Sequence, residues 1–167
     1  MKTITPYKWE INNNKYHFVT DNFCVYDIVF EYSEKFFDEY CTSCKDIFEM
    51  TINCLSHDCP VYDSRAGLTV CKIVEEVLSE SCNGIMYRIY DGDGKQERRE
   101  MRFDRWIELY DSEDKIDQLS QEFCEEECDK YFLLVDKGCK NYPVVVHDFN
   151  YRCKECEESG DMIQYGE

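Results

Sequence analysis

Alternating apolar and polar residues dominate the first third of the chain and predict β-strands. The alternation runs through Tyr7, Trp9 and Ile11 and resumes at Tyr16 and Phe18, as expected for strands with one buried face. Residues 12–14 and 21–22 are rich in Asn and Asp, which tolerate left-handed backbone, and so predict turns. Further strands are predicted over residues 25–32 and 47–55. The segment 34–44 is ambiguous, although its aromatic residues could face a core from a short helix.

A helical spacing replaces this pattern after residue 63. Asp63 or Ser64 can cap a helix over residues 64–81, and Asn83 and Gly84 supply its stop. Its predicted buried stripe has apolar residues at i, i+3, i+4, i+7 and i+8. These residues are Val70, Ile73, Val74, Val77 and Leu78.

The rest of the chain predicts a strand at 85–90, a helix at 95–110, a hairpin of strands 116–123 and 131–135, and a last helix. Pro143 fits the first turn of that last helix. The predicted order is therefore ββββ-α-β-α-ββ-α. Adjacent strands with about three helices indicate an α+β fold, an antiparallel sheet with helices on one side. We expect a single domain over residues 1–159 and a frayed tail over 160–167.

The charge is strongly one-sided. Nineteen basic and 36 acidic residues give a net charge of −17, while 43% of the residues are hydrophobic and 15% aromatic. The aromatic content predicts a folded chain. The negative charge repels nucleic acid, so direct binding of nucleic acid is not expected, and the expected protein partner is basic.

No segment is long and apolar enough to cross a bilayer, and residues 1–10 lack a signal-peptide pattern. A cytoplasmic location without membrane contact is the resulting expectation. The 12 cysteines are accordingly expected to be reduced thiols that hold no metal.

Two strings in the middle of the chain are distinctive: Tyr87 to Arg99, which contains Gly94-Lys95-Gln96, and Phe103-Asp104-Arg105-Trp106. With them, the chain resembles a bacterial family of small uncharacterised proteins known as a domain of unknown function. The resemblance spans residues 7–155 and implies a shared α+β fold without a known activity. Many of the cysteines lie outside the family pattern, which counts against a family-wide metal or redox role.

Basic residues cluster at the start of the second predicted helix. Lys95, Arg98, Arg102 and Arg105 are the candidate anion- or partner-binding residues, because three of these arginines share a helix face and guanidinium groups grip carboxylates or phosphates. A glycine-rich turn before a helix also presents N–H groups to an anion. The alternative is that these arginines form intramolecular ion pairs with nearby carboxylates.

Other chemistry is weaker. Cys41 and Cys44, and Cys153 and Cys156, have the spacing of zinc ligands, but the pairs lie over a hundred residues apart and are only low-ranking zinc candidates. The turn at residues 91–94 fails as a calcium loop, because Gln96 and Arg102 occupy the loop positions that need Gly and Glu. No known catalytic motif accompanies the three histidines. No cofactor is expected.

Three functions follow as hypotheses. The leading one is a non-enzymatic interaction or regulatory protein that docks a partner through its acidic faces or through the helix carrying Phe103 and Trp106. The alternative is a binder or enzyme for a phosphorylated or nucleotide-like ligand at residues 92–105. A second alternative is an acidic mimic of nucleic acid. A pocket in which Arg98, Arg102 and Arg105 converge would favour the ligand, whereas an exposed aromatic patch would favour docking.

Overall fold

The computed structural model describes residues 3–32, 47–56, 63–81, 84–88, 94, 96–111, 113–124 and 128–150. Nine strands and helices have defined bounds. They are β1 (Trp9–Asn12), β2 (Lys15–Val19), β3 (Val25–Tyr32), β4 (Ile47–Cys54), α1 (Ser64–Ser81), β5 (Gly84–Arg88), α2 (Gln96–Tyr110), β6 (Ile116–Cys124) and β7 (Cys128–Asp136). A further helix covers residues 142–150. The α+β class and the predicted order of elements are confirmed.

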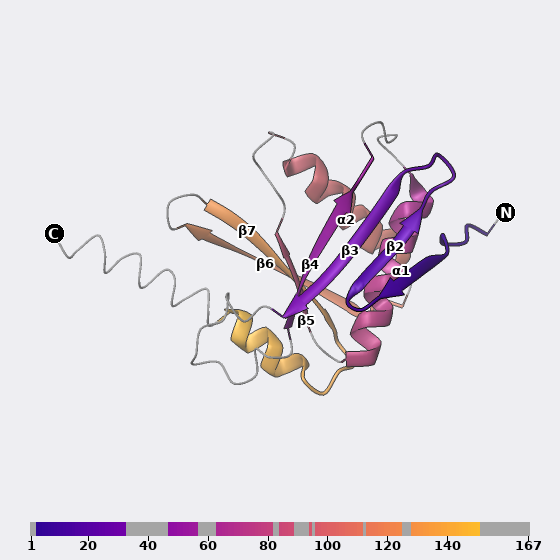
Figure 1. Ribbon diagram of the computed structural model, residues 1–167. Coiled ribbons are helices and arrows are strands. Elements are labelled where there is room, and N and C mark those ends of the chain that lie inside the picture. The colour runs from indigo at the N-terminus through magenta and orange to yellow at the C-terminus, as the bar shows by residue number, and fades with distance from the viewer. Residues whose placement is uncertain are drawn as a thin grey trace.

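One seven-stranded sheet organises the molecule, in the order β1-β2-β3-β4-β5-β7-β6 (Figure 1). All neighbours are antiparallel except β4 and β5, which run parallel with Ile47 opposite Gly84 and Glu49 opposite Met86. β7 lies between β5 and β6 and pairs with both. The sheet is therefore two antiparallel parts joined by one short parallel ladder.

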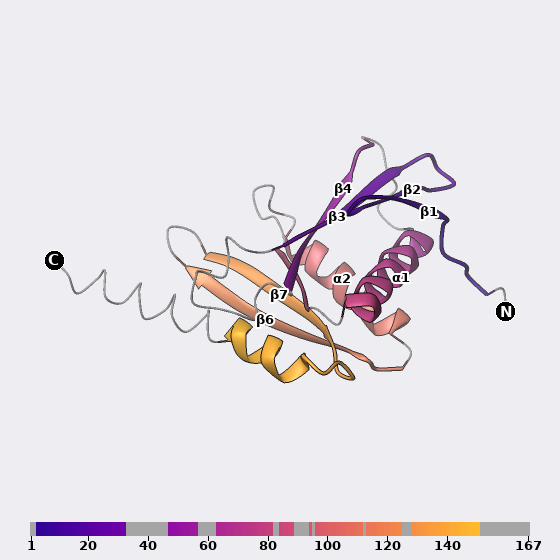
Figure 2. The same cartoon turned by 60° about the horizontal axis from the view of Figure 1, so that its bottom comes forward.

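The two faces of the sheet carry separate cores. α1 and α2 cover one face, where Phe18, Ile28 and Ile85 are among the buried residues. The helix at 142–150 packs on the other face, where Val145 and Phe149 join Leu133 and other residues of β4, β5 and β7 (Figure 2). The expectation that all helices lie on one side is therefore wrong. Alternate residues of β5 and β7 are buried on opposite faces, so both faces of these strands need a cover.

The helix α1 begins and ends where its sequence pattern predicts. The Asp63 carboxylate accepts hydrogen bonds from the backbone N–H groups of Arg65 at 2.9 Å and Ala66 at 3.1 Å, which makes Asp63 the N-cap. Gly67 lets the indole of Trp106 on α2 approach closely, because an added Cβ would lie 2.3 Å from Trp106 Nε1. The hydroxyl of Tyr110 also donates a hydrogen bond to the Ser64 carbonyl at 2.9 Å. These contacts fix α2 against the first turns of α1.

Candidate functional site

A cavity of about 530 Å³ opens where the parallel strands part. The β4–β5 ladder joins residues 47–49 to residues 84–86, and in the described part of the chain no later residue of β4 pairs with β5. From Met50 onward β4 keeps its pairing with β3, while Tyr87 and Arg88 stay paired with β7. The gap between the two strands is lined by both of them, by the start of α1 and by α2, and we call it the wedge pocket.

The apolar wall of the wedge pocket is continuous with the core between the sheet and the helices. Met50, Tyr87 and Phe103 are all buried, and the rings of Tyr87 and Phe103 lie 4.5 Å apart between centroids. The Tyr87 hydroxyl accepts a hydrogen bond from Gln118 Nε2 at 2.8 Å. Burial is the main reason that the pKa of Tyr87 is raised well above its ordinary value, so this wall is uncharged at neutral pH.

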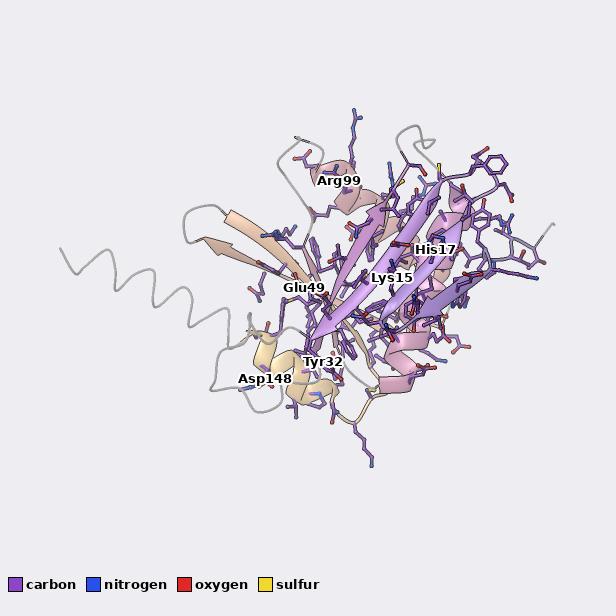
Figure 3. All side chains as sticks on the ribbon, in the orientation of Figure 1. Lys15, His17, Tyr32, Glu49, Arg99 and Asp148 are labelled. Carbon is purple, nitrogen blue, oxygen red and sulfur yellow. The ribbon has the colours of Figure 1, made fainter. Side chains whose placement is uncertain are left out.

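Three arginines bring positive charge to the pocket: Arg88 from the end of β5, and Arg99 and Arg102 from α2 (Figure 3 labels Arg99). Arg102 is half-buried and makes no hydrogen bond or ion pair with a described residue. The pocket also contains two carboxylates, Glu49 and Asp63. Asp63 is already engaged, since it caps α1 and accepts a hydrogen bond from the Tyr7 hydroxyl at 3.0 Å.

The predicted arginine cluster is thus only partly the observed one. Arg102 lines the pocket as expected, whereas Arg98 and Arg105 are exposed and do not line it. Lys95 lies outside the described residues. Arg99 belongs to the same basic cluster but was not among the candidate binding residues, although it lies four and seven residues before Phe103 and Trp106 and so shares their helix face. Its place on that face was the signal that could have identified it.

A hydroxyl and a thiol meet at the outer end of the pocket. Tyr26 and Cys54 face each other across β3 and β4, and both line the cavity. Burial, followed by the charge of Cys54 and its side-chain hydrogen bond, raises the pKa of Tyr26 to about 12, and the charge of Arg102 acts in the opposite direction. Tyr26 is therefore within electrostatic reach of Cys54, Asp63 and Arg102.

The cysteines differ from expectation. Cys24 and Cys139 each take part in a disulfide bond. This finding contradicts the prediction that all the cysteines are reduced. Cys54 and Cys71 carry thiols, and burial raises the pKa of Cys71 to about 12. The zinc candidates Cys41, Cys44, Cys153 and Cys156 all lie outside the described residues. Within the described ranges, no group of three or more His, Cys, Asp or Glu side chains could hold a metal ion.

The two histidines in the described part of the chain, His17 and His147, each lie beside an aspartate and outside the wedge pocket, and His57 lies outside the described residues. His17 Nδ1 lies 2.6 Å from the buried carboxylate of Asp27, which Lys15 also contacts at 3.2 Å. This network lies on β2 and β3, where Figure 3 labels Lys15 and His17, and none of its members lines the wedge pocket. His147 lies 3.4 Å from its neighbour Asp148.

Comparisons with known proteins add a distant likeness. No family model matches the chain, and no curated protein does. A solved structure, described as a CoA-dependent acyl-homoserine lactone synthase, MesI, is similar with a TM-score of 0.34 and 14% sequence identity. The match covers 75% of this chain and 63% of the synthase, so this chain spans less than two thirds of the length of the synthase. Among the helices of the described residues, none has the length and apolar character needed to cross a membrane.

Proposed function

We propose that the wedge pocket binds a phosphorylated, nucleotide-like small molecule. The observation that carries this proposal is the half-buried guanidinium of Arg102, which has no ion-pair partner among the described residues. The chain has 36 acidic and 19 basic residues, so intramolecular partners are abundant. A cation that stays unpaired in such a chain is costly to bury, and a bound phosphate would offset that cost through charge-assisted hydrogen bonds.

The shape of the pocket favours a ligand with two chemically different ends. Beyond the parallel ladder, Met50–Asn53 have no described strand neighbour on the side of β5. The backbone N–H and C=O groups along this edge can bind amides of an extended ligand, as an added strand would. Ile52 and Phe103 offer apolar contact beside that edge. A phosphate at the arginines and an amide-bearing arm along β4 would use both features.

The position of the pocket supports the same proposal. In open sheets with parallel strands, ligands bind in the crevice beyond the carboxyl ends of the strands. This crevice lies at the point where the order of the strands in the sheet reverses. β4 and β5 make the parallel ladder of this sheet, and each is followed by a helix that contributes to the pocket: Asp63 and Ala66 at the start of α1, Arg99 and Arg102 in α2.

Docking through the aromatic residues of α2 is less well supported. Phe103 is 7% exposed, and Trp106 packs against the core and over Gly67. Large exposed apolar residues of α2 are instead Met101 and Leu109, on other faces of the helix. The sequence hypothesis for a ligand asked for a pocket in which Arg98, Arg102 and Arg105 converge, and of these three only Arg102 lines the wedge pocket, beside Arg88 and Arg99.

Thermal unfolding with four probes tests the proposal: pyrophosphate, ATP, coenzyme A and pantetheine. A ligand at a hundred times its Kd adds about 2.7 kcal/mol of stability, which raises Tm by roughly 5–10 °C in a chain of this size. Coenzyme A carries both a phosphorylated nucleotide and an amide-bearing arm, so it is expected to give the largest rise. ATP and pyrophosphate test the arginines alone, and pantetheine tests the strand edge alone.

Matched charge variants provide the control. Arg102→Gln is expected to remove the rise caused by the phosphorylated probes, whereas Arg105→Gln, which removes the same charge from an exposed position, should leave it. Equal losses in both variants would assign the effect to general electrostatics. The absence of any rise with the three phosphorylated probes, pyrophosphate, ATP and coenzyme A, would refute the proposal.

A further inference from the structure

The thiol of Cys54 occupies an unusual place in this chain. It lies at the end of β4, is exposed, and is not part of a disulfide. It lines the wedge pocket together with Tyr26 and Arg102. Its Sγ lies 3.6 Å from the Ser56 carbonyl, to which the thiol donates a hydrogen bond, and Tyr26 is the residue opposite it on β3. An exposed thiol, a tyrosine hydroxyl and an unpaired guanidinium therefore line one cavity.

This combination is the environment in which cysteines react. The thiolate is the nucleophile in thiol–disulfide exchange, and nearby cations and hydrogen-bond donors stabilise it. The Tyr26 hydroxyl keeps its proton at neutral pH, because its pKa is raised to about 12, so it remains a donor. Arg102 has no carboxylate partner in the described part of the chain, so its charge is available to an incoming anion.

We propose that Cys54 is a modification site for anionic disulfides, which the wedge pocket selects by their negative charge. The proposal rests on the proposed function, in that the same guanidinium groups attract the ligand. In the reaction, the Cys54 thiol loses its proton to solvent and Sγ attacks one sulfur of the disulfide. A new S–S bond forms to Cys54, the original S–S bond breaks, and the departing thiolate takes up a proton.

The net charge of the chain makes the proposal testable, because the charge of the whole protein and the charge of the pocket predict opposite preferences between anionic and cationic disulfides. At −17, the protein as a whole repels anions and attracts cations, so a thiol without local positive charge should react faster with a cationic disulfide. Faster reaction with an anionic disulfide requires a local field of the opposite sign. Cys71 is an internal reference, since its thiol is buried and should react with neither reagent.

The experiment compares oxidised glutathione, which is anionic, with cystamine, which is cationic, on the whole folded protein. Mass spectrometry of the digested protein follows the peptide that contains Cys54, and Cys54→Ser confirms its assignment. Each rate is divided by the rate of the same reagent with a synthetic peptide of residues 50–58. This division removes the intrinsic reactivity of the reagents and leaves the effect of the pocket.

The normalised rate with oxidised glutathione is expected to exceed that with cystamine. The ratio should fall roughly tenfold in Arg102→Gln, within the range that charged clefts add to association rates, and should stay unchanged in Arg105→Gln. It should also shrink as salt is added. Tm measured for each variant shows that it is folded under the assay conditions.

Two results would overturn the inference: a ratio below one in the wild type, or a ratio that Arg102→Gln leaves unchanged. Neither result touches the ligand proposal, which the thermal shifts with phosphorylated probes test on their own. Conversely, a charge-selective Cys54 in a protein that no phosphorylated probe stabilises would support the modification site and reject the ligand.

Discussion

Replacing Gly67 with alanine is predicted to destabilise the protein, although the same change in an exposed helix is stabilising. Gly67 lies in the first turns of α1, under the indole of Trp106. An alanine methyl would lie 2.3 Å from Nε1 and 2.5 Å from Cδ1 of that ring, far inside the contact distance of about 3.5–4.0 Å between carbon atoms. The indole cannot simply turn away, because it packs against Phe103 with ring centroids 5.9 Å apart.

The magnitude follows from two opposing terms. Alanine is favoured over glycine in a helix by about 1 kcal/mol, whereas forcing extra volume into a packed site costs about 1–3 kcal/mol. The terms leave a net destabilisation of about 1–2 kcal/mol when the clash is near its upper range. In a chain of this size, Tm should then fall by roughly 2–8 °C.

A double-mutant cycle isolates the clash. Trp106→Ala alone should cost about 3 kcal/mol through lost burial and a cavity, but in that background Gly67→Ala should be stabilising by up to about 1 kcal/mol. Urea unfolding, followed by circular dichroism without reductant, measures the wild type and the three variants with the disulfides intact. An equal effect of Gly67→Ala in both backgrounds would refute the reasoning, because it would mean that the methyl and the indole do not meet.

Three further predictions concern local contacts. Asp63→Ala should lower the free energy of unfolding by about 1–2 kcal/mol, because it removes the N-cap of α1. The control Ser79→Ala, near the end of the same helix, should change it by less than about 0.5 kcal/mol. Urea unfolding compares the two variants. Phe23 is 84% exposed and has a φ of 62°, so Phe23→Gly should raise stability by up to about 1 kcal/mol, whereas Phe23→Ala, which keeps a Cβ, should not. The pKa of Asp27 is lowered from 3.8, first by the hydrogen bond with His17 and then by Lys15, so its contribution to stability is present above that pH and is lost as the pH falls through the folded value. Tm measured between about pH 2 and 6 should therefore drop more steeply below about pH 4 in the wild type than in Asp27→Asn, and parallel curves would contradict this assignment.

Elements that depend on local signals were predictable from the sequence. The helix over residues 64–81 is observed as Ser64–Ser81, because its apolar stripe and the capping carboxylate of Asp63 both lie within the segment. The strand over residues 25–32 is likewise observed as Val25–Tyr32. The hairpin strands are longer than predicted, at Ile116–Cys124 and Cys128–Asp136, since polar residues at its far end interrupt the alternation that marks a strand.

Features that depend on partners distant in sequence were not predictable. The parallel pairing of β4 with β5 and the position of the helix at 142–150 follow from which faces remain uncovered after folding. The same limit applies to the thiols. The expectation of reduced cysteines relied on the missing signal pattern, whereas the disulfides of Cys24 and Cys139 depend on which thiols the fold brings together.

The candidate site shows the same division between local and distant signals. Arg102 was predictable because it lies in a basic cluster on one helix. Arg88 was not, since it ends a strand whose relation to β4 cannot be inferred from either segment alone. The pocket exists because β4 and β5 stay with different antiparallel partners, β3 and β7, after only a short parallel ladder. β3 keeps β4 in place and β7 keeps β5 in place, while the right-handed twist of the sheet rotates neighbouring strands relative to one another. β4 and β5 therefore separate where no ladder joins them. A local break in regular pairing is where a protein can give up stability for function, and here the break exposes a strand edge beside Arg102, which forms no ion pair with a described residue.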